Sequence, residues 1–166
     1  MALALFPQSL GNAGIQQTLA KMAALTNGAI LDPAIRDQAA YATSACDRRE
    51  KLCLCHSLMS WVSRNVRYVR DPAGVELLHD PRLIARAIKD KRLVYGDCDD
   101  MSMFLGALLK SVGLRPTFRA VGYNGRPFQH VYVMCEGLKL DATRSVWAPA
   151  GYSYPQEETS VMEKAV

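Results

Sequence analysis

Apolar residues recur every three or four positions over residues 15–112, which is the spacing of helices with one buried face. Asp32-Pro33 and Asp80-Pro81 each supply an N-cap followed by proline at the first helical position. Asp47 and Glu50 resemble a capping box that would start another helix. The helices predicted from these signals span residues 15–28, 33–45, 48–66, 81–92 and 98–112, after an irregular lead at 1–14.

From residue 117 the pattern becomes typical of strands, which we predict over 117–123, 128–135 and 138–143. Asn124-Gly125 is a strong signal for a hairpin turn between the first two of them. Residues 144–155 are predicted to form an irregular surface flap, and the polar tail from Gln156 to fray. Helices followed by an antiparallel β-meander favour an α+β fold in which the sheet packs on the helix at 98–112.

A chain of 166 residues fits one domain, since domains usually hold about 100–200 residues. We divide it into a helical part (1–60), a core (61–143) and a C-terminal extension (144–166). The net charge of +4 comes from scattered basic residues, so no nucleic-acid partner is expected. No window approaches the ~18 apolar residues of a membrane span, and no signal peptide is recognisable. We therefore expect a cytoplasmic protein that does not bind membranes.

The five cysteines are an odd number, which argues against a disulfide framework. Cys53 and Cys55 lie two positions apart on a predicted helix, so their side chains point in different directions and are not expected to share a metal. Cys135 alternates with His130 along its strand and is expected to face the core. His79, next to an Asp-Pro pair, is predicted to be a turn residue.

Cys98 lies at the predicted start of the helix 98–112. Asp97 is a good N-cap, and Gly113 and Pro116 end the helix. The helix dipole favours negative charge at this end, and a thiolate is the nucleophilic form of cysteine. The alternative interpretation is an inert buried cysteine.

His130 and Asp141 lie on the second and third predicted strands. If Cys135 pairs with Leu138, His130 is diagonal to Asp141 on the same face, and a slip of two residues places them directly opposite. If that face meets the start of the Cys98 helix, the imidazole can take the thiol proton and the carboxylate can orient the imidazole. The backbone N–H of Cys98 would then serve as an oxyanion donor.

Three aspartates, Asp97, Asp99 and Asp100, surround Cys98 in the sequence and would raise the pKa of its thiol. We expect their carboxylates to be occupied as acceptors at the start of the helix or in ion pairs with Arg119 or Arg144.

A metal site remains an alternative for the same region. Cys98, Asp99, Asp100 and His130 could supply ligands, although no pair among them has the usual zinc spacing. We therefore expect no cofactor.

Taken together, these motifs resemble the transglutaminase-like superfamily, which has a papain-like core with cysteine on a helix and histidine and aspartate on adjacent strands. The version of these motifs in this chain, with Asp71-Pro72 followed by Val75-Glu-Leu-Leu78, is similar to that of small transglutaminase-like proteins of phages and prophages. The segments that carry the resemblance are Trp61 to Pro72, Tyr95-Gly-Asp-Cys-Asp-Asp100, Leu108 to Leu114, Phe118 to Gly122, Gln129-His-Val-Tyr-Val133 and Leu140-Asp-Ala-Thr143.

The resemblance implies that Cys98 is the nucleophile, His130 the general base and then acid, and Asp141 the orienting carboxylate. A second oxyanion donor would come from Tyr68 or Gln129, although Tyr68 is more simply interpreted as a core tyrosine.

The function expected is that of a cysteine protease or transglutaminase-like acyltransferase that attacks an amide bond of a peptide or protein through a thioester. Water is the favoured acceptor, and a lysine amine is the other. The alternative is a non-enzymatic phage virion or assembly protein that uses the same fold to bind phage structural proteins.

Overall fold

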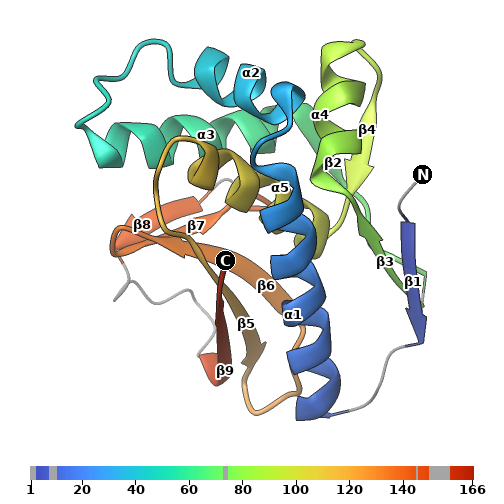
Figure 1. Ribbon diagram of the computed structural model, residues 1–166. Helices are drawn as coiled ribbons and strands as arrows, with labels where there is room; N and C mark the ends of the chain where they lie inside the picture. The colour runs from blue at the N-terminus through green and yellow to red at the C-terminus, as the bar shows by residue number, and fades with distance from the viewer. Residues whose placement is uncertain (1–2, 8–10, 73–74, 145, 150–157) are drawn as a thin grey trace.

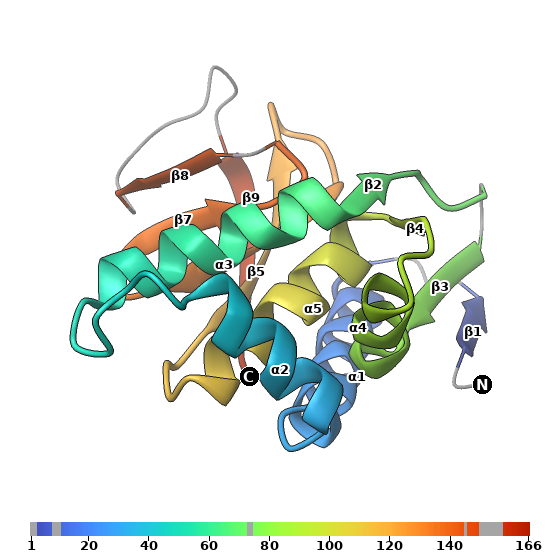
Figure 2. The ribbon, with the colours of Figure 1, turned by 90° about the horizontal axis from the view of Figure 1, so that it is seen from above.

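The computed structural model describes residues 3–7, 11–72, 75–144, 146–149 and 158–166. Helix α5 (Cys98–Ser111) lies at the centre of the molecule (Figures 1 and 2). Four other helices contact α5, and strands of a larger sheet cover its remaining side. These helices are α1 (Asn12–Ala29), α2 (Pro33–Ala42), α3 (Lys51–Asn65) and α4 (Pro81–Lys89).

The larger sheet has five antiparallel strands in the order β8-β7-β6-β5-β9. This arrangement of helices on an antiparallel sheet confirms the predicted α+β class and the predicted meander. The strands are β5 (Thr117–Tyr123), β6 (His130–Cys135), β7 (Leu138–Asp141), β8 (Val146–Pro149) and β9 (Glu158–Ala165).

Two small sheets complete the fold beside α4. The first pairs β1 (Leu3–Pro7) with β3 (Val75–His79) in antiparallel fashion, and the second pairs β2 (Val66–Tyr68) with β4 (Val94–Gly96) in parallel. The prediction of an irregular lead over residues 1–14 was therefore wrong for residues 3–7, in β1, and 12–14, in α1, and residues 1–2 and 8–10 lie outside the described residues. Pairing with a strand some 70 residues away is a long-range contact, which local composition does not reveal.

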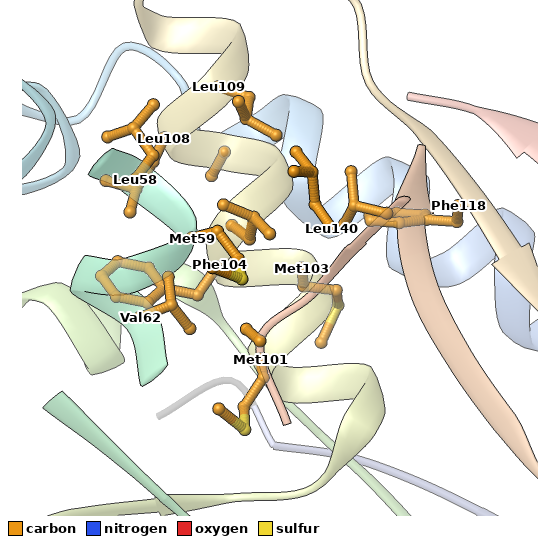
Figure 3. Packing of buried hydrophobic residues seen from close by; sticks show 14 of the residues in the cluster. Leu58, Met59, Val62, Met101, Met103, Phe104, Leu108, Leu109, Phe118 and Leu140 are labelled. Carbon is orange, nitrogen blue, oxygen red and sulfur yellow. The ribbon is translucent and has the colours of Figure 1, made fainter. Parts of the chain in front are cut away.

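The hydrophobic core surrounds α5, in which every residue from Asp99 to Leu109 is buried. A helix that is covered on all sides in this way forms the centre of a domain. Figure 3 shows the contribution of α3 on one side of α5 and that of the sheet on the other. The fully buried side chains in this cluster include Leu58, Val62, Met103, Phe104, Leu108, Phe118 and Leu140.

Local capping chemistry fixes the starts of α2 and α4 as predicted. The Asp32 carboxylate accepts the N–H of Ala34, and the Asp80 carboxylate accepts the N–H of Arg82, both at 2.9 Å. The proposed capping box at Asp47 was wrong. Asp47 instead accepts the N–H of Arg49 at 2.8 Å within a separate turn, and α3 begins after Glu50.

The C-terminal segment is more ordered than its sequence predicts. The tail after residue 157 forms β9, which pairs with β5 along nearly its whole length, and residues 146–149 form β8 beside β7. Both the fraying tail and the irregular flap were therefore wrong where the structure describes them. Residues 145 and 150–155 of the predicted flap and residues 156–157 of the predicted tail lie outside the described residues. In the described part of β9 more and less exposed residues alternate, as expected of a strand with one covered face.

Cys46, in the loop after α2, and Cys53, in α3, form a disulfide with their Cα atoms 5.8 Å apart. The odd number of cysteines had argued against a disulfide framework, and a single disulfide was not predicted. A count cannot reveal a pair that a short loop brings together, and three thiols remain free: Cys55, Cys98 and Cys135. No helix in the described part of the chain is long and apolar enough to cross a membrane.

Candidate active site

Cys98 is the first residue of α5, directly after the strand β4. The Asp97 side chain caps the helix by accepting the N–H groups of Asp99, at 3.0 Å, and Asp100, at 3.3 Å. These bonds do not use the N–H of Cys98. Gly96 is required before this turn, because a Cβ there would lie 2.8 Å from the Cβ of Asp100. The predicted helix start and cap are confirmed.

His130 begins β6 and Asp141 ends β7, and their side chains meet. His130 Nε2 lies 2.7 Å from Asp141 Oδ2. Cys135 pairs with Leu138, which is the first of the two registers considered from the sequence and makes His130 and Asp141 diagonal neighbours. The Asp141 carboxylate also accepts the N–H of Thr143 at 3.1 Å and its hydroxyl at 2.7 Å.

Asp141 is fully buried, and burial alone would raise the pKa of its carboxyl. Hydrogen bonds from His130 and Thr143 and the nearby charge of Arg144 outweigh burial, so the pKa lies below its usual range. The carboxylate is therefore ionised at neutral pH. It can only accept a hydrogen bond from His130, so it selects the tautomer in which Nε2 carries the hydrogen. The ring nitrogen left to accept a proton is Nδ1.

A cleft of about 1130 Å³ brings Cys98 and His130 together, with Asp141 behind the imidazole. The start of β6 lies directly against Cys98, because the backbone N–H of Val131 donates a hydrogen bond to the Cys98 sulfur. One turn further along α5, the Ser102 hydroxyl donates to the carbonyl of Val131 at 3.3 Å. The start of β6 therefore meets the start of the Cys98 helix, a contact that was only a condition of the sequence-based prediction. The side chains that β6 packs into the core around α5, those of Val131, Val133 and Cys135, lie on the face opposite His130.

The sequence set the helix dipole at Cys98 against the neighbouring aspartates, and two of these aspartates raise the pKa of the thiol as expected. Burial raises the pKa of the thiol, and the carboxylates of Asp99 and Asp97 raise it further, while the N–H of Val131 acts in the opposite direction. The thiol donates to Asp99 Oδ1 at 3.6 Å. The pKa of the Cys98 thiol therefore lies well above its usual range, which favours the protonated form at neutral pH.

Asp100 has a partner that the sequence did not predict. His79 donates its backbone N–H to Asp100 Oδ1 at 2.8 Å, and its Nδ1 lies 2.7 Å from Oδ2. His79 is thus the last residue of β3 and not a turn residue. Of the arginines proposed as partners of the aspartates, Arg119 pairs with Glu163, and Arg144 lies 3.8 Å from Asp141.

The two residues considered as additional oxyanion donors, Tyr68 and Gln129, both line the cleft. Tyr68 is 46% exposed, so its interpretation as a core tyrosine was wrong. Gln129 lies in the loop before β6, where its N–H donates to the carbonyl of Val121 at 2.8 Å. A third cleft residue, Tyr123, was missed, although strand alternation from Val121, the partner of His130, could have indicated it.

The metal-ligand set considered from the sequence is not assembled. Asp100 is bound to His79, and His130 is bound to Asp141. Among the described residues, the group of three or more potential ligand atoms that all lie within 4.8 Å of one another consists of Asp97, Cys98 and Asp99.

No family profile and no curated protein matches the chain in sequence. Among solved structures it is similar to a protein from Cytophaga hutchinsonii described as a "putative cysteine protease", at 13% identity and a TM-score of 0.45. The alignment covers 99% of this chain and 62% of the other, so this chain spans about three fifths of that protein's length. A likeness of this size says nothing of the reaction, and the function proposed below depends on the geometry of the site itself.

Proposed function

We propose that the chain is a cysteine-dependent amide hydrolase or acyltransferase of the transglutaminase-like kind, with Cys98, His130 and Asp141 as its catalytic residues. One observation carries the proposal. A histidine bound through Nε2 to a buried carboxylate shares a cleft with a helix-start cysteine, whose sulfur accepts the N–H of the residue that follows the histidine. This is the arrangement in which a base can activate a thiol.

In the proposed reaction, His130 Nδ1 takes the thiol proton and the Cys98 sulfur attacks the carbonyl carbon of an amide. The carbonyl oxygen becomes negatively charged in the tetrahedral intermediate and accepts the N–H of Cys98, which the capping bonds of Asp97 do not use. The imidazolium returns the proton to the leaving nitrogen as the C–N bond breaks, and a thioester remains on Cys98. Water, activated by His130, then attacks the thioester and releases the acid together with the free thiol.

Because the pKa of the Cys98 thiol is raised, the proposed reaction depends more on His130 as a base than the reaction of an enzyme that rests as a thiolate–imidazolium ion pair. Because the resting sulfur is protonated, attack and proton transfer are coupled, and a neutral imidazole is required at the start. Asp141, ionised and bound to Nε2, stabilises the imidazolium that forms.

Water is the proposed acceptor because Cys98 is partly exposed in a cleft of about 1130 Å³, which leaves space for solvent beside a bound acyl group. A lysine amine in the same position would give cross-linking in place of hydrolysis. The substrate class proposed is a peptide or protein, and a phage or prophage setting remains the proposal implied by the sequence resemblance.

The test is digestion of a peptide library by the wild-type protein and by two variants. Cys98→Ala is expected to abolish cleavage, whereas Cys135→Ala, which removes another free cysteine on β6, is expected to retain it. Labelling by a thiol-reactive probe should follow the same order. Cleavage that survives Cys98→Ala would contradict the proposal, and a wild-type protein that binds peptides without cleaving or labelling would indicate the non-enzymatic assembly role.

A further inference from the structure

Tyr123, the last residue of β5, lies beside the proposed base. Its ring is stacked with that of His130, with the ring centroids 6.5 Å apart and the planes inclined by 29°. Its side chain lines the same cleft as Cys98 and His130, although only 5% of the residue is exposed.

The Tyr123 hydroxyl is buried and has no hydrogen-bond partner among the residues that the structure describes. Burying a hydroxyl without a partner is unfavourable, so such a group in a cleft indicates a ligand that completes it. A comparison lies on the next strand, where the hydroxyl of buried Tyr132 donates to Glu158 Oε1 at 3.0 Å. Tyr132 is structural by this criterion, and Tyr123 is available to a ligand.

The Tyr123 hydroxyl is a donor at neutral pH. Burial raises its pKa to about 12, in spite of the Arg144 guanidinium that lies 5.5 Å above the ring and favours the charged form. A protonated phenol can donate a hydrogen bond to an oxygen of the ligand, and it gains most from an oxygen on which negative charge develops.

We propose that the Tyr123 hydroxyl is an oxyanion donor: it binds the acyl oxygen of the substrate while the Cys98 sulfur adds to the carbonyl carbon. The inference rests on the proposed function and adds a catalytic residue to it. No covalent bond to Tyr123 forms or breaks. The phenol keeps its proton throughout and acts together with the N–H of Cys98 on the oxygen.

The experiment compares two reactions of Cys98 in one protein. Acylation by p-nitrophenyl acetate passes through a tetrahedral oxyanion, whereas alkylation by iodoacetamide is a displacement at a saturated carbon and forms none. Tyr123→Phe removes only the hydroxyl and is expected to slow acylation, at saturating ester, by about tenfold or more. Alkylation should change by less than about twofold, since no oxyanion needs a donor.

Tyr132→Phe is the matched control, because it removes a buried hydroxyl that the cleft does not contain. It should leave both rates within about twofold of the wild type, in line with a hydroxyl that binds only within the protein. A Tyr123→Phe variant that loses both reactions equally, loses neither, or changes only the ester concentration for half-saturation would overturn the oxyanion role.

The same data separate this inference from the function on which it rests. Cys98→Ala gives the background acylation of other groups. If the wild type does not exceed that background, both the proposed function and the oxyanion role fall. If the wild type exceeds it and Tyr123→Phe equals the wild type, the function stands and Tyr123 alone is excluded.

Discussion

At the scale of single residues, the protonation of Cys98 depends on its immediate neighbour. Asp99 Oδ1 accepts a hydrogen bond from the Cys98 thiol at 3.6 Å. After burial, the negative charge of Asp99 is the largest cause of the raised pKa of the thiol. The sequence showed that aspartates surround Cys98 but could not show whether they or the helix dipole would dominate. Burial decides the outcome, because charges interact more strongly where water is excluded.

Asp99→Asn tests this balance. Removing the negative charge favours the thiolate, so the pH midpoint of Cys98 alkylation by iodoacetamide should fall by about one unit, and the rate at pH 7 should rise by up to about tenfold. Asp37→Asn is the control, since Asp37 lies exposed on α2 and pairs with Lys89. A midpoint that stays in place or rises in Asp99→Asn would show that Asp99 does not set the pKa of the thiol.

At the scale of elements, the pair formed by His79 and Asp100 joins β3 to the first turn of the Cys98 helix. The hydrogen bond to Asp100 raises the pKa of His79, and the nearby charges of Asp71 and Asp97 act in the same direction, against the effect of partial burial. A histidine whose folded pKa is raised contributes stability that is fully present below its unfolded pKa. That contribution is lost as the pH rises through the folded pKa.

His79→Gln should therefore lower the melting temperature more at pH 5.5 than at pH 9. The glutamine keeps a polar side chain but cannot carry the positive charge, and the backbone N–H bond to Asp100 is unaffected by the change. Thermal unfolding of both proteins across this range measures the difference. A gap that is constant or widens towards high pH would contradict the ion pair.

Local chemistry predicted the elements that depend on it. The Asp-Pro starts and the turn between the strands predicted at 128–135 and 138–143 follow from residues close in sequence. Of the two registers considered for these strands, the one with Cys135 opposite Leu138 is observed. Positive φ angles of 50° at Glu136 and 75° at Gly137 form the tight turn that fixes this register. The register in turn brings His130 to Asp141, which is why the most specific feature of the site could be predicted.

Elements that depend on distant partners could not be predicted. β9 pairs with β5 across some 40 residues, and its polar sequence gave no local signal. Its contacts are long-range: Glu158 accepts from Lys139 at 2.9 Å and from Tyr132, and Glu163 accepts from Arg119. A polar strand at the edge of a sheet looks like a tail until its partner is known.

At the scale of the whole molecule, one hydrophobic cluster extends from Leu19 in α1 to Ala142 after β7 and includes Met22, Ala120 and Val131, which line the cleft. The disulfide links Cys46, in the loop between α2 and α3, to Cys53 in the first turn of α3. A bridge across so short a loop restricts the unfolded chain and contributes about 2–3 kcal/mol on the loop-entropy estimate.

Reduction of the wild type should therefore lower its free energy of unfolding by about 2–3 kcal/mol. The double variant Cys46→Ser/Cys53→Ser should match the reduced wild type and should not respond to dithiothreitol. Denaturant unfolding with and without the reductant measures both. A wild type that dithiothreitol leaves unchanged would contradict the disulfide as a contributor to stability.

The pairing of Cys98 with His130 as nucleophile and base is tested most directly by the pH dependence of acylation, followed by mass spectrometry of the modified peptide. The wild type should carry the acyl group on Cys98. His130→Gln should lower the rate at pH 7 by about 100-fold or more, with recovery at high pH where the thiolate forms without a base. His56→Gln, an exposed histidine on α3, should behave as the wild type. An acyl group on Cys55 or Cys135, or a His130→Gln variant as fast as the wild type at pH 7, would contradict the assignment.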